Sequence, residues 1–142
     1  MSNLLNQLIS ISVSKIPDQA LSEWRLSKIY FSKSPEVCLC GKSNIKECCI
    51  IINTRNGNKA LLGSSCVKLI LNKDCSFVFN LKKSNSTLKL KKLSSTEIRT
   101  LLDVGIINEW ESDFLGNISK RENISIAQME IINKIKNRLN TN

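Results

Sequence analysis

Histidine is missing from this chain of 142 residues, and aromatic residues are scarce at 5%. Without histidine, the chain cannot use Ser-His-Asp or Cys-His catalysis, and no zinc site in it can include a histidine ligand. The few aromatic side chains argue against stacking of single-stranded bases as the main activity. No phosphate-binding loop, dinucleotide fingerprint, nucleophile elbow or catalytic pair of carboxylates is recognisable. We therefore expect that the protein is not an enzyme.

Long apolar runs are missing as well. No run approaches the roughly 18–20 residues that span a bilayer. Residues 1–13 (MSNLLNQLISISV) have neither the positive charge nor the small-residue cleavage site of a signal peptide. We expect a cytoplasmic protein without a membrane partner. In that compartment the six cysteines are better explained as reduced thiols that hold a metal than as a disulfide framework.

Positive charge, by contrast, is abundant. The chain has 21 Lys and Arg residues against 12 Asp and Glu residues, which gives a net charge of +9. This balance favours a polyanionic partner such as nucleic acid, although a basic protein that is merely soluble would show it too.

The clearest local signal is a hairpin within residues 38–66, which also hold five of the six cysteines. The β-branched run at 46–53 predicts a strand. The dipeptide Asn56-Gly57 predicts a type I′ turn, and residues 58–62 predict the return strand.

Cysteines stand at both ends of this hairpin. Cys38 and Cys40 flank a tight turn before the first strand, and Cys66 falls in the first turn of a helix that Ser64 or Ser65 can cap. A turn, a hairpin and a helix in this order are typical of a treble-clef-like zinc module, in which the helix N-terminus stabilises a thiolate.

Structural zinc takes four tetrahedral ligands. The layout supplies three of them: Cys38, Cys40 and Cys66. The fourth comes from Cys48 or Cys49, which point to opposite faces of a strand, and we favour Cys49. A site of four thiolates has no open position, so its Zn²⁺ would be structural. Buried free cysteines are the alternative, and Cys75 lies outside the pattern.

This spacing resembles a small cysteine-rich module of phages and mobile elements. The matching residues are Cys38, Cys40, Gly41, Cys49, Ile51, Asn53, Asn56, Gly57, Gly63, Ser64, Cys66 and Val67. The resemblance covers roughly residues 20–71. It implies zinc binding and a mobile-element setting in which nucleic-acid binding is the usual activity, and it brings no reaction with it.

The flanking segments have their own patterns. Before the module we expect a helix within 3–13 and a second helix from Pro17 to about Ile29, with Trp24 in the core. After it, residues 73–93 predict a second hairpin, with strands near 76–82 and 87–92. Five lysines cluster around its break: Lys82, Lys83, Lys89, Lys91 and Lys92. They would bind phosphates, or else they protect a sheet edge from aggregation.

The tail predicts three helices that each begin with a capping box. The paired residues are Ser94 with Glu97, Asn108 with Glu111, and Ser125 with Gln128. Their apolar stripes predict a packed core, or a groove for a protein partner. Residues 105–135 also resemble a tail motif of phage and plasmid proteins, WE-x-x-FL-x-x-I followed by LS-x-x-Q-x-x-I, with Ile124 in place of the leucine. That resemblance implies a helical docking element without catalytic residues.

Together these features predict an α+β protein in four parts. They are a helical lead-in at 1–36, the zinc module at 37–72, a basic hairpin or connector at 73–93 and a helical region at 94–142. We expect a non-catalytic, zinc-stabilised accessory protein that binds DNA or RNA. The alternative is an adaptor or inhibitor that acts on a host enzyme. The salt dependence of binding distinguishes the two, because the affinity for phosphates falls steeply as the salt concentration rises.

Overall fold

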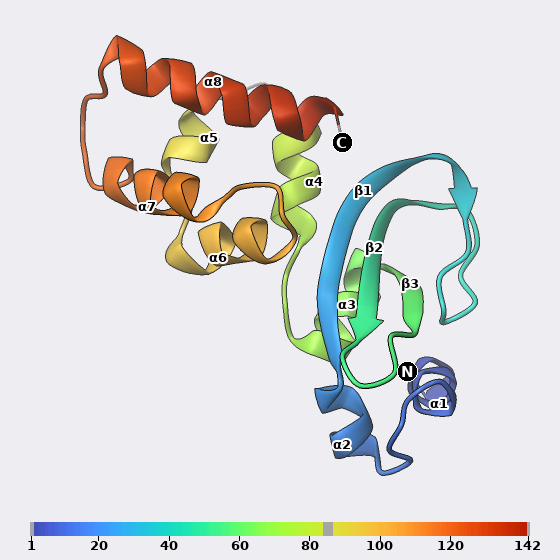
Figure 1. The fold of residues 1–142 in the computed structure, drawn as a ribbon. Helices are drawn as coiled ribbons and strands as arrows, with labels where there is room; N and C mark the ends of the chain where they lie inside the picture. Colours follow the sequence, from blue (N-terminus) through green and yellow to red (C-terminus); the bar gives the residue numbers. More distant parts are fainter. Residues whose placement is uncertain (1, 84–86, 142) are drawn as a thin grey trace. The chain divides into compact units, whose positions relative to one another are not determined.

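The computed structural model describes residues 2–83 and 87–141 of the chain (Figure 1). Within these residues the fold is α+β, with a three-stranded antiparallel sheet and eight helices. The chain divides into two compact units, residues 1–75 and residues 76–142. In the described part of the chain, no helix is both long and apolar enough to cross a membrane.

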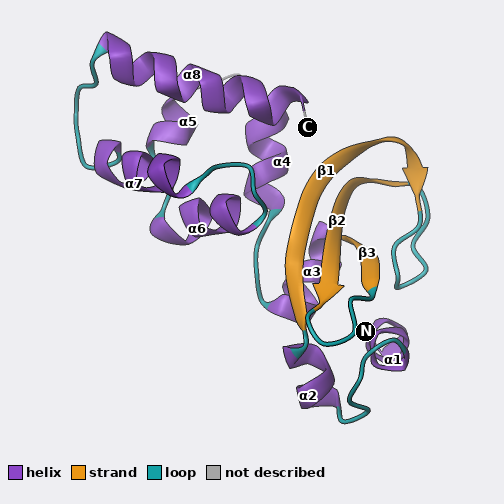
Figure 2. Ribbon diagram, viewed as in Figure 1, coloured by secondary structure: helices purple, strands orange, loops and turns teal. Residues whose placement is uncertain are grey.

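The first unit contains the sheet. Its elements in chain order are α1 (Ser2–Ser10), α2 (Pro17–Ser22), β1 (Trp24–Glu36), β2 (Ile45–Asn53), β3 (Lys59–Gly63) and α3 (Ser64–Leu71). The strands lie in the order β1-β2-β3 (Figure 2). Helix α3 contacts all three strands, and Cys75, just beyond it, contacts Cys49 of β2. We call the face that carries Cys49 the inner face and the opposite one the outer face.

The inner face is the core of this unit. Side chains alternate along a strand, so cross-strand neighbours share a face. The inner residues Leu26, Ile29, Cys49, Ile51 and Leu62 are all buried. Apolar residues of the helices are buried as well: Leu4, Leu8, Val67 and Ile70. The hairpin of β2 and β3 and the helix that follows it confirm the expectation from sequence.

The helical lead-in is confirmed only as far as Ser22. Helix α2 ends there, and the residues expected to continue it form the start of β1. Trp24, Leu26 and Ile29 are buried while Arg25 and Lys28 are exposed, which is the period of a strand with one bulge between Leu26 and Lys28. Pairing with β2 outweighs the local helical pattern, because strand formation depends on distant neighbours. Trp24 is in the core as expected.

The turn between β2 and β3 also differs from the expectation. Residues 54–58 separate the strands, so the connection is longer than a two-residue type I′ turn. Gly57 has a φ of +78°, but Asn56 does not have the positive φ that a type I′ turn requires. The side chain of Asn53 accepts hydrogen bonds from the N–H groups of Arg55 and Asn56, at 2.9 and 3.1 Å, and thereby stabilises the longer loop.

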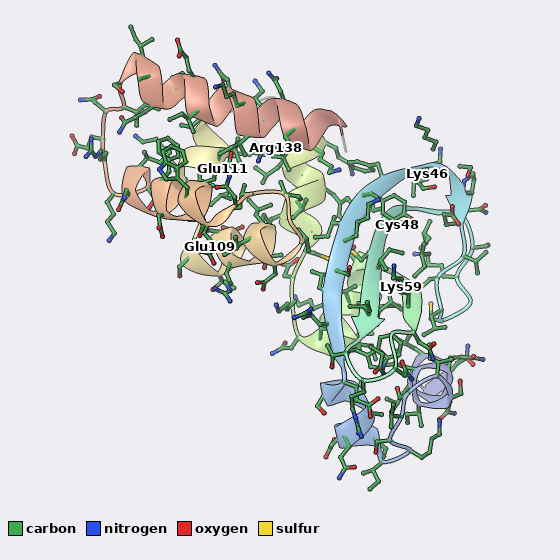
Figure 3. All side chains as sticks on the ribbon, viewed as in Figure 1. Lys46, Cys48, Lys59, Glu109, Glu111 and Arg138 are labelled. Carbon is green, nitrogen blue, oxygen red and sulfur yellow. The ribbon has the colours of Figure 1, made fainter. Side chains whose placement is uncertain are left out.

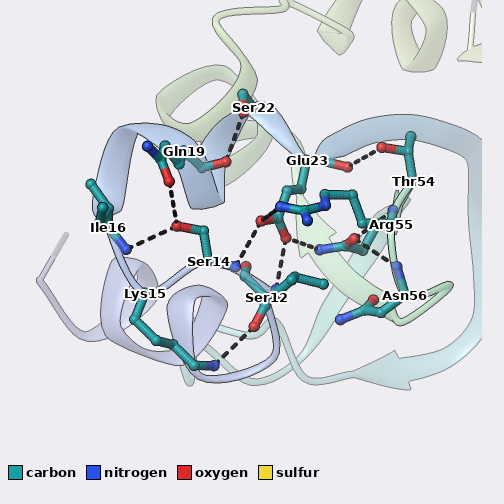
Figure 4. Close-up of polar contacts among 12 residues, drawn as sticks. Ser12, Ser14, Lys15, Ile16, Gln19, Ser22, Glu23, Thr54, Arg55 and Asn56 are labelled. Carbon is teal, nitrogen blue, oxygen red and sulfur yellow. Dashed lines mark hydrogen bonds and ion pairs between the residues drawn. The ribbon is translucent and has the colours of Figure 1, made fainter.

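A buried carboxylate ties this loop to the N-terminal segment (Figure 4). Glu23 accepts hydrogen bonds from the N–H groups of Val13 and Ser14 and from the Asn53 side chain, each at 2.8 Å. Arg55 lies 3.5 Å from the same carboxylate. Burial raises the pKa of Glu23, but the hydrogen bonds and Arg55 outweigh it and lower the pKa. The ionised carboxylate therefore holds together segments that are far apart in sequence.

The second unit is helical in its described residues. Its elements are α4 (Ser76–Lys83), α5 (Thr87–Lys91), α6 (Ser95–Asp103), α7 (Glu109–Ile118) and α8 (Ile126–Thr141). The predicted second hairpin is wrong, since α4 and α5 occupy its place, and residues 84–86 of its break lie outside the described residues. Val78 and Phe79 are consecutive and both buried, which a one-sided strand does not allow, and α4 packs against α8.

The three capping boxes of the tail are confirmed. Each cap side chain accepts the N–H of its partner, and each partner side chain accepts the N–H of the cap, at 2.8–3.2 Å. Gly105 follows α6 with a φ of +76°, the left-handed conformation that favours glycine after a helix. Most of the apolar stripe residues are buried, among them Leu101, Leu115, Ile132 and Ile135. The helices form a core, as expected.

Candidate metal centre and basic surfaces

Three cysteines of the first unit form a cluster that could hold a metal ion. The Sγ atoms of Cys38, Cys40 and Cys66 all lie within 4.8 Å of one another. Cys38 and Cys40 are in the loop between β1 and β2, and Cys66 is the third residue of α3. Their separation permits one ion to contact all three sulfur atoms, as the spacing predicted.

The turn that carries Cys38 and Cys40 is fixed by its backbone. The N–H of Gly41 donates to the carbonyl of Cys38 at 2.8 Å, and the N–H of Cys38 donates to the carbonyl of Lys42 at 2.9 Å. Gly41 has a φ of +98°, which favours glycine at this position. The N–H of Leu39 donates to the carbonyl of Leu61 at 2.9 Å, so the turn is anchored on β3.

Backbone amides point at the sulfur atoms. The N–H of Gly63 lies 3.4 Å from Sγ of Cys38. The pKa of Cys40 is lowered, chiefly by a hydrogen bond from the backbone of Lys42. Burial and the neighbouring thiols raise the pKa of Cys66 to about 12. A bound divalent cation would reverse this last effect, because a coordinating thiol loses its proton.

Helix α3 starts one or two residues earlier than expected, at Ser64. Its N-cap is Gly63, without a side-chain cap, so neither Ser64 nor Ser65 has the predicted capping role. Gly63 pairs with Cys48 across the strands while its N–H faces Cys38. The end of β3 thus joins the sheet, the thiol cluster and the first turn of α3.

Cys49 is not the fourth member of the cluster, which corrects the prediction. Its Sγ atom lies 3.3 Å from Sγ of Cys75, and both side chains are fully buried. The substitute, Cys48, is also outside the cluster, since it faces Tyr30 across the strands and hydrogen bonds with it. Burial raises the pKa of both Cys48 and Cys49, with the Cys75 thiol as the larger cause at Cys49.

The cluster opens onto a hollow in the surface. Its lining includes the three cysteines, and around them stand Lys42, Lys46, Glu47, Ser64 and Ser65. Lys42 and Lys46 are exposed. Within the described residues, the group of possible metal ligands consists of these three cysteines, and no further cysteine, aspartate or glutamate belongs to it.

The five lysines predicted to bind phosphates do not share a hairpin. Lys82 and Lys83 lie in the last turn of α4, Lys89 and Lys91 lie in α5, and Lys92 follows it. The ammonium group of Lys91 donates to the carbonyl of Glu122 at 2.7 Å. Lys89 and Lys92 line a common hollow, together with Phe77, Leu81 and Leu93. The cluster is therefore spread over two helices.

A basic surface that the sequence reasoning missed lies on the outer face of the sheet. Arg25, Ile52 and Lys59 form one cross-strand row, and Lys28, Ile50 and Leu61 form the next. The three cations are exposed, and the Lys28 ammonium lies 5.3 Å from the ring centroid of Tyr30. Lys59 is labelled on this part of the sheet in Figure 3. The alternation of apolar and polar side chains in residues 24–30 is the sequence signal for strand β1, although the apolar spacing from Ala20 onward also fits a helix.

Comparisons of this chain with protein-family models, with curated proteins and with solved structures find no match. Its function is therefore argued from its own residues.

Proposed function

We propose that the protein is a zinc-stabilised nucleic-acid-binding accessory protein, without catalytic activity of its own, in a phage or mobile element. The observation that carries this proposal is the outer face of the sheet, where Arg25, Lys28 and Lys59 surround half-buried aliphatic side chains. The two cross-strand rows contain no carboxylate, so the surface suits an anionic partner with some apolar area.

Zinc is the metal we propose for the cluster. Thiolates are soft ligands that select zinc, copper(I) or iron–sulfur clusters, and redox-inert zinc is the usual ion in small structural sites. The first unit has about 75 residues, and its buried core consists of aliphatic side chains, four cysteines and one tryptophan. A metal would add folding free energy that so small a core supplies only in part. It would hold the loop after β1 to the start of α3.

The proposed contacts are electrostatic. If the three cations neutralise three phosphates of duplex DNA, the logarithm of the binding constant falls with the logarithm of salt at a slope of about 2.7. Affinity would then fall about 40-fold between 50 and 200 mM salt. For a single strand, the slope is about 2.1 and the loss about 20-fold. The few aromatic residues favour contacts to the backbone over stacked bases.

The test is a gel shift with short duplex DNA, single-stranded DNA and single-stranded RNA at two salt concentrations. Lys59→Glu should weaken binding and lower the salt slope by at least about 0.9. The matched control is Lys68→Glu, which makes the same charge change at an exposed lysine of α3, on the inner side of the sheet. Equal losses in the two variants would reject the outer face as the binding surface, and no binding at low salt would reject the proposal.

One observation favours the second candidate, a protein adaptor or inhibitor. In the second unit Trp110 is 60% exposed and stacks on Phe114 at a centroid distance of 5.6 Å. Ile126 is 82% exposed. Exposed aromatic and aliphatic side chains are typical of protein interfaces. An adaptor that uses them would bind its target, for example a host defence enzyme, with little dependence on salt.

A further inference from the structure

We infer that a metal ion in the three-thiol cluster keeps one coordination position open to solvent, and that this position takes an exogenous thiolate from a small thiol. The inference rests on the proposed metal binding. It also differs from the expectation from sequence, in which four cysteine thiolates fill every coordination position of the metal.

The first argument is the number of donors. Zinc takes four ligands, and a site with three protein ligands keeps a water or another exchangeable ligand in the fourth position. The two cysteines that the sequence offers as a fourth ligand both have other partners. Cys49 is buried against Cys75, and Cys48 is buried and forms a hydrogen bond with the side chain of Tyr30. Cys49 could join the cluster only if the centre of β2 left its pairing with both neighbours. Cys48 is close enough to Cys38 for the two thiols to interact electrostatically, so the argument against it is its hydrogen bond with Tyr30.

The second argument is access. Cys38, Cys40 and Cys66 line the hollow described above, which is open to solvent, although Cys38 itself is buried. Cys40 and Cys66 are only partly buried. A small molecule could therefore reach an ion bound there without any rearrangement of the sheet or of α3.

The third argument is charge. Three thiolates and one divalent cation carry a net charge of −1, and a fourth thiolate brings it to −2. The exposed ammonium groups of Lys42 and Lys46 stand around the hollow and favour an anion over neutral water. The amide N–H groups that point at Cys38 and Cys40 stabilise the same negative charge. Glu47 also lines the hollow, where the two lysines outnumber its single carboxylate.

The exchange itself is a simple ligand substitution. The metal-bound water leaves as water, the incoming thiol gives its proton to solvent, and its sulfur forms the new bond to the metal. No electron is transferred. A thiolate is the favoured anion, because zinc is a borderline-soft ion that binds sulfur strongly.

The test is X-ray absorption on the full-length zinc protein, purified with a phosphine reductant so that no thiol is present. We expect three sulfur neighbours at about 2.3 Å and one oxygen or nitrogen neighbour at about 2.0–2.1 Å. Addition of excess 2-mercaptoethanol should convert this shell to four sulfur neighbours. Four sulfur neighbours before the addition, or no change after it, would overturn the inference. A protein that binds no metal at all would instead reject the proposed metal site.

Variants separate the open position from a hidden fourth cysteine. Cys48→Ala and Cys49→Ala should each leave the wild-type count of three sulfur neighbours unchanged, and a count one lower than that of the wild type in either variant would show that this cysteine is a ligand. Cobalt-substituted protein gives the affinity for 2-mercaptoethanol from its visible spectrum. Lys42→Ala combined with Lys46→Ala should weaken that affinity roughly 2- to 30-fold at unchanged metal content. Lys68→Ala, outside the hollow, should not, and an equal effect would refute the role of charge.

Discussion

Replacement of Arg138 by methionine should destabilise the second unit far more than an ordinary surface change. The Arg138 guanidinium donates to both carboxylate oxygens of Glu111, at 2.7 and 3.0 Å, and to the carbonyl of Ile106 at 2.7 Å (Figure 3). Glu111 is also the partner of Asn108 in the capping box of α7. This single side chain therefore joins α8 to the start of α7 and to the loop before it.

The expected magnitude follows from burial. A hydrogen bond to a charged group contributes about 1.5–3 kcal/mol, but the Arg138 side chain is 39% exposed and water screens part of that. Methionine keeps the aliphatic stem and leaves Glu111, at 8% side-chain exposure, without its cation. We expect a loss of about 2 kcal/mol, which for a unit of this size lowers the melting temperature by roughly 8–16 °C. Hydrogen exchange in peptides from α7 and α8 assigns the loss to this unit.

Arg99→Met is the matched control. Arg99 pairs with Asp103 at 3.3 Å on one helix, but its side chain is 72% exposed. A pair of this kind contributes about 0.3–0.5 kcal/mol. If Arg138→Met lowers the free energy of unfolding by no more than Arg99→Met does, the bidentate pair does not hold the helices together and the reasoning is refuted.

The same pair predicts a pH dependence. Burial raises the pKa of Glu111, but the hydrogen bonds from Arg138 and Asn108 outweigh it and lower the pKa. The ionised carboxylate thus stabilises the unit above its unfolded pKa of about 4.3, and this stabilisation is lost as pH falls through the lower folded value. The difference in unfolding free energy between the wild type and Arg138→Met should be full at pH 7 and shrink below about pH 4.

Three further predictions concern other sites. Glu23→Gln should lower the hydrogen-exchange protection of the Val13 and Ser14 amides, and the wild type should lose the same protection, relative to the intrinsic exchange rate at each pH, in acid, because the pKa of Glu23 is lowered and its stabilisation is lost as pH falls. Unchanged protection would contradict the anchoring role. Ser125→Ala should cost about 1 kcal/mol and fray the first turn of α8 in helicity measurements, whereas Ser125→Asp should not. Cys49→Ala should keep its zinc by elemental analysis, and loss of the metal would reject our assignment.

Local chemistry made parts of the fold predictable. The capping boxes at Ser94, Asn108 and Ser125 involve residues three apart, so sequence alone contains both partners. The turn around Cys38 and Gly41 is similarly local. The β-branched run of β2 is a strong strand signal because isoleucine side chains pack well on a pleated sheet.

Distant contacts decided the parts that sequence reasoning missed. Strand β1 exists because it pairs with β2, about 20 residues away, and its first residues suit a helix just as well. The serine-rich break after Lys83 suggested a turn between strands, while packing of Phe79 in a helical core gave α4. The adjacent residues Cys48 and Cys49 could not be ranked as ligands from spacing, because the answer depends on Tyr30 on one face and Cys75 on the other.

The most direct test of the metal centre is the zinc content of the purified full-length protein, measured by elemental analysis together with its circular dichroism. The wild type should contain about one zinc per chain. Cys38→Ser and Cys66→Ser should lose the metal and the folded structure of the first unit, whereas Cys75→Ser should retain the zinc. A fully folded wild-type protein without metal would contradict the account.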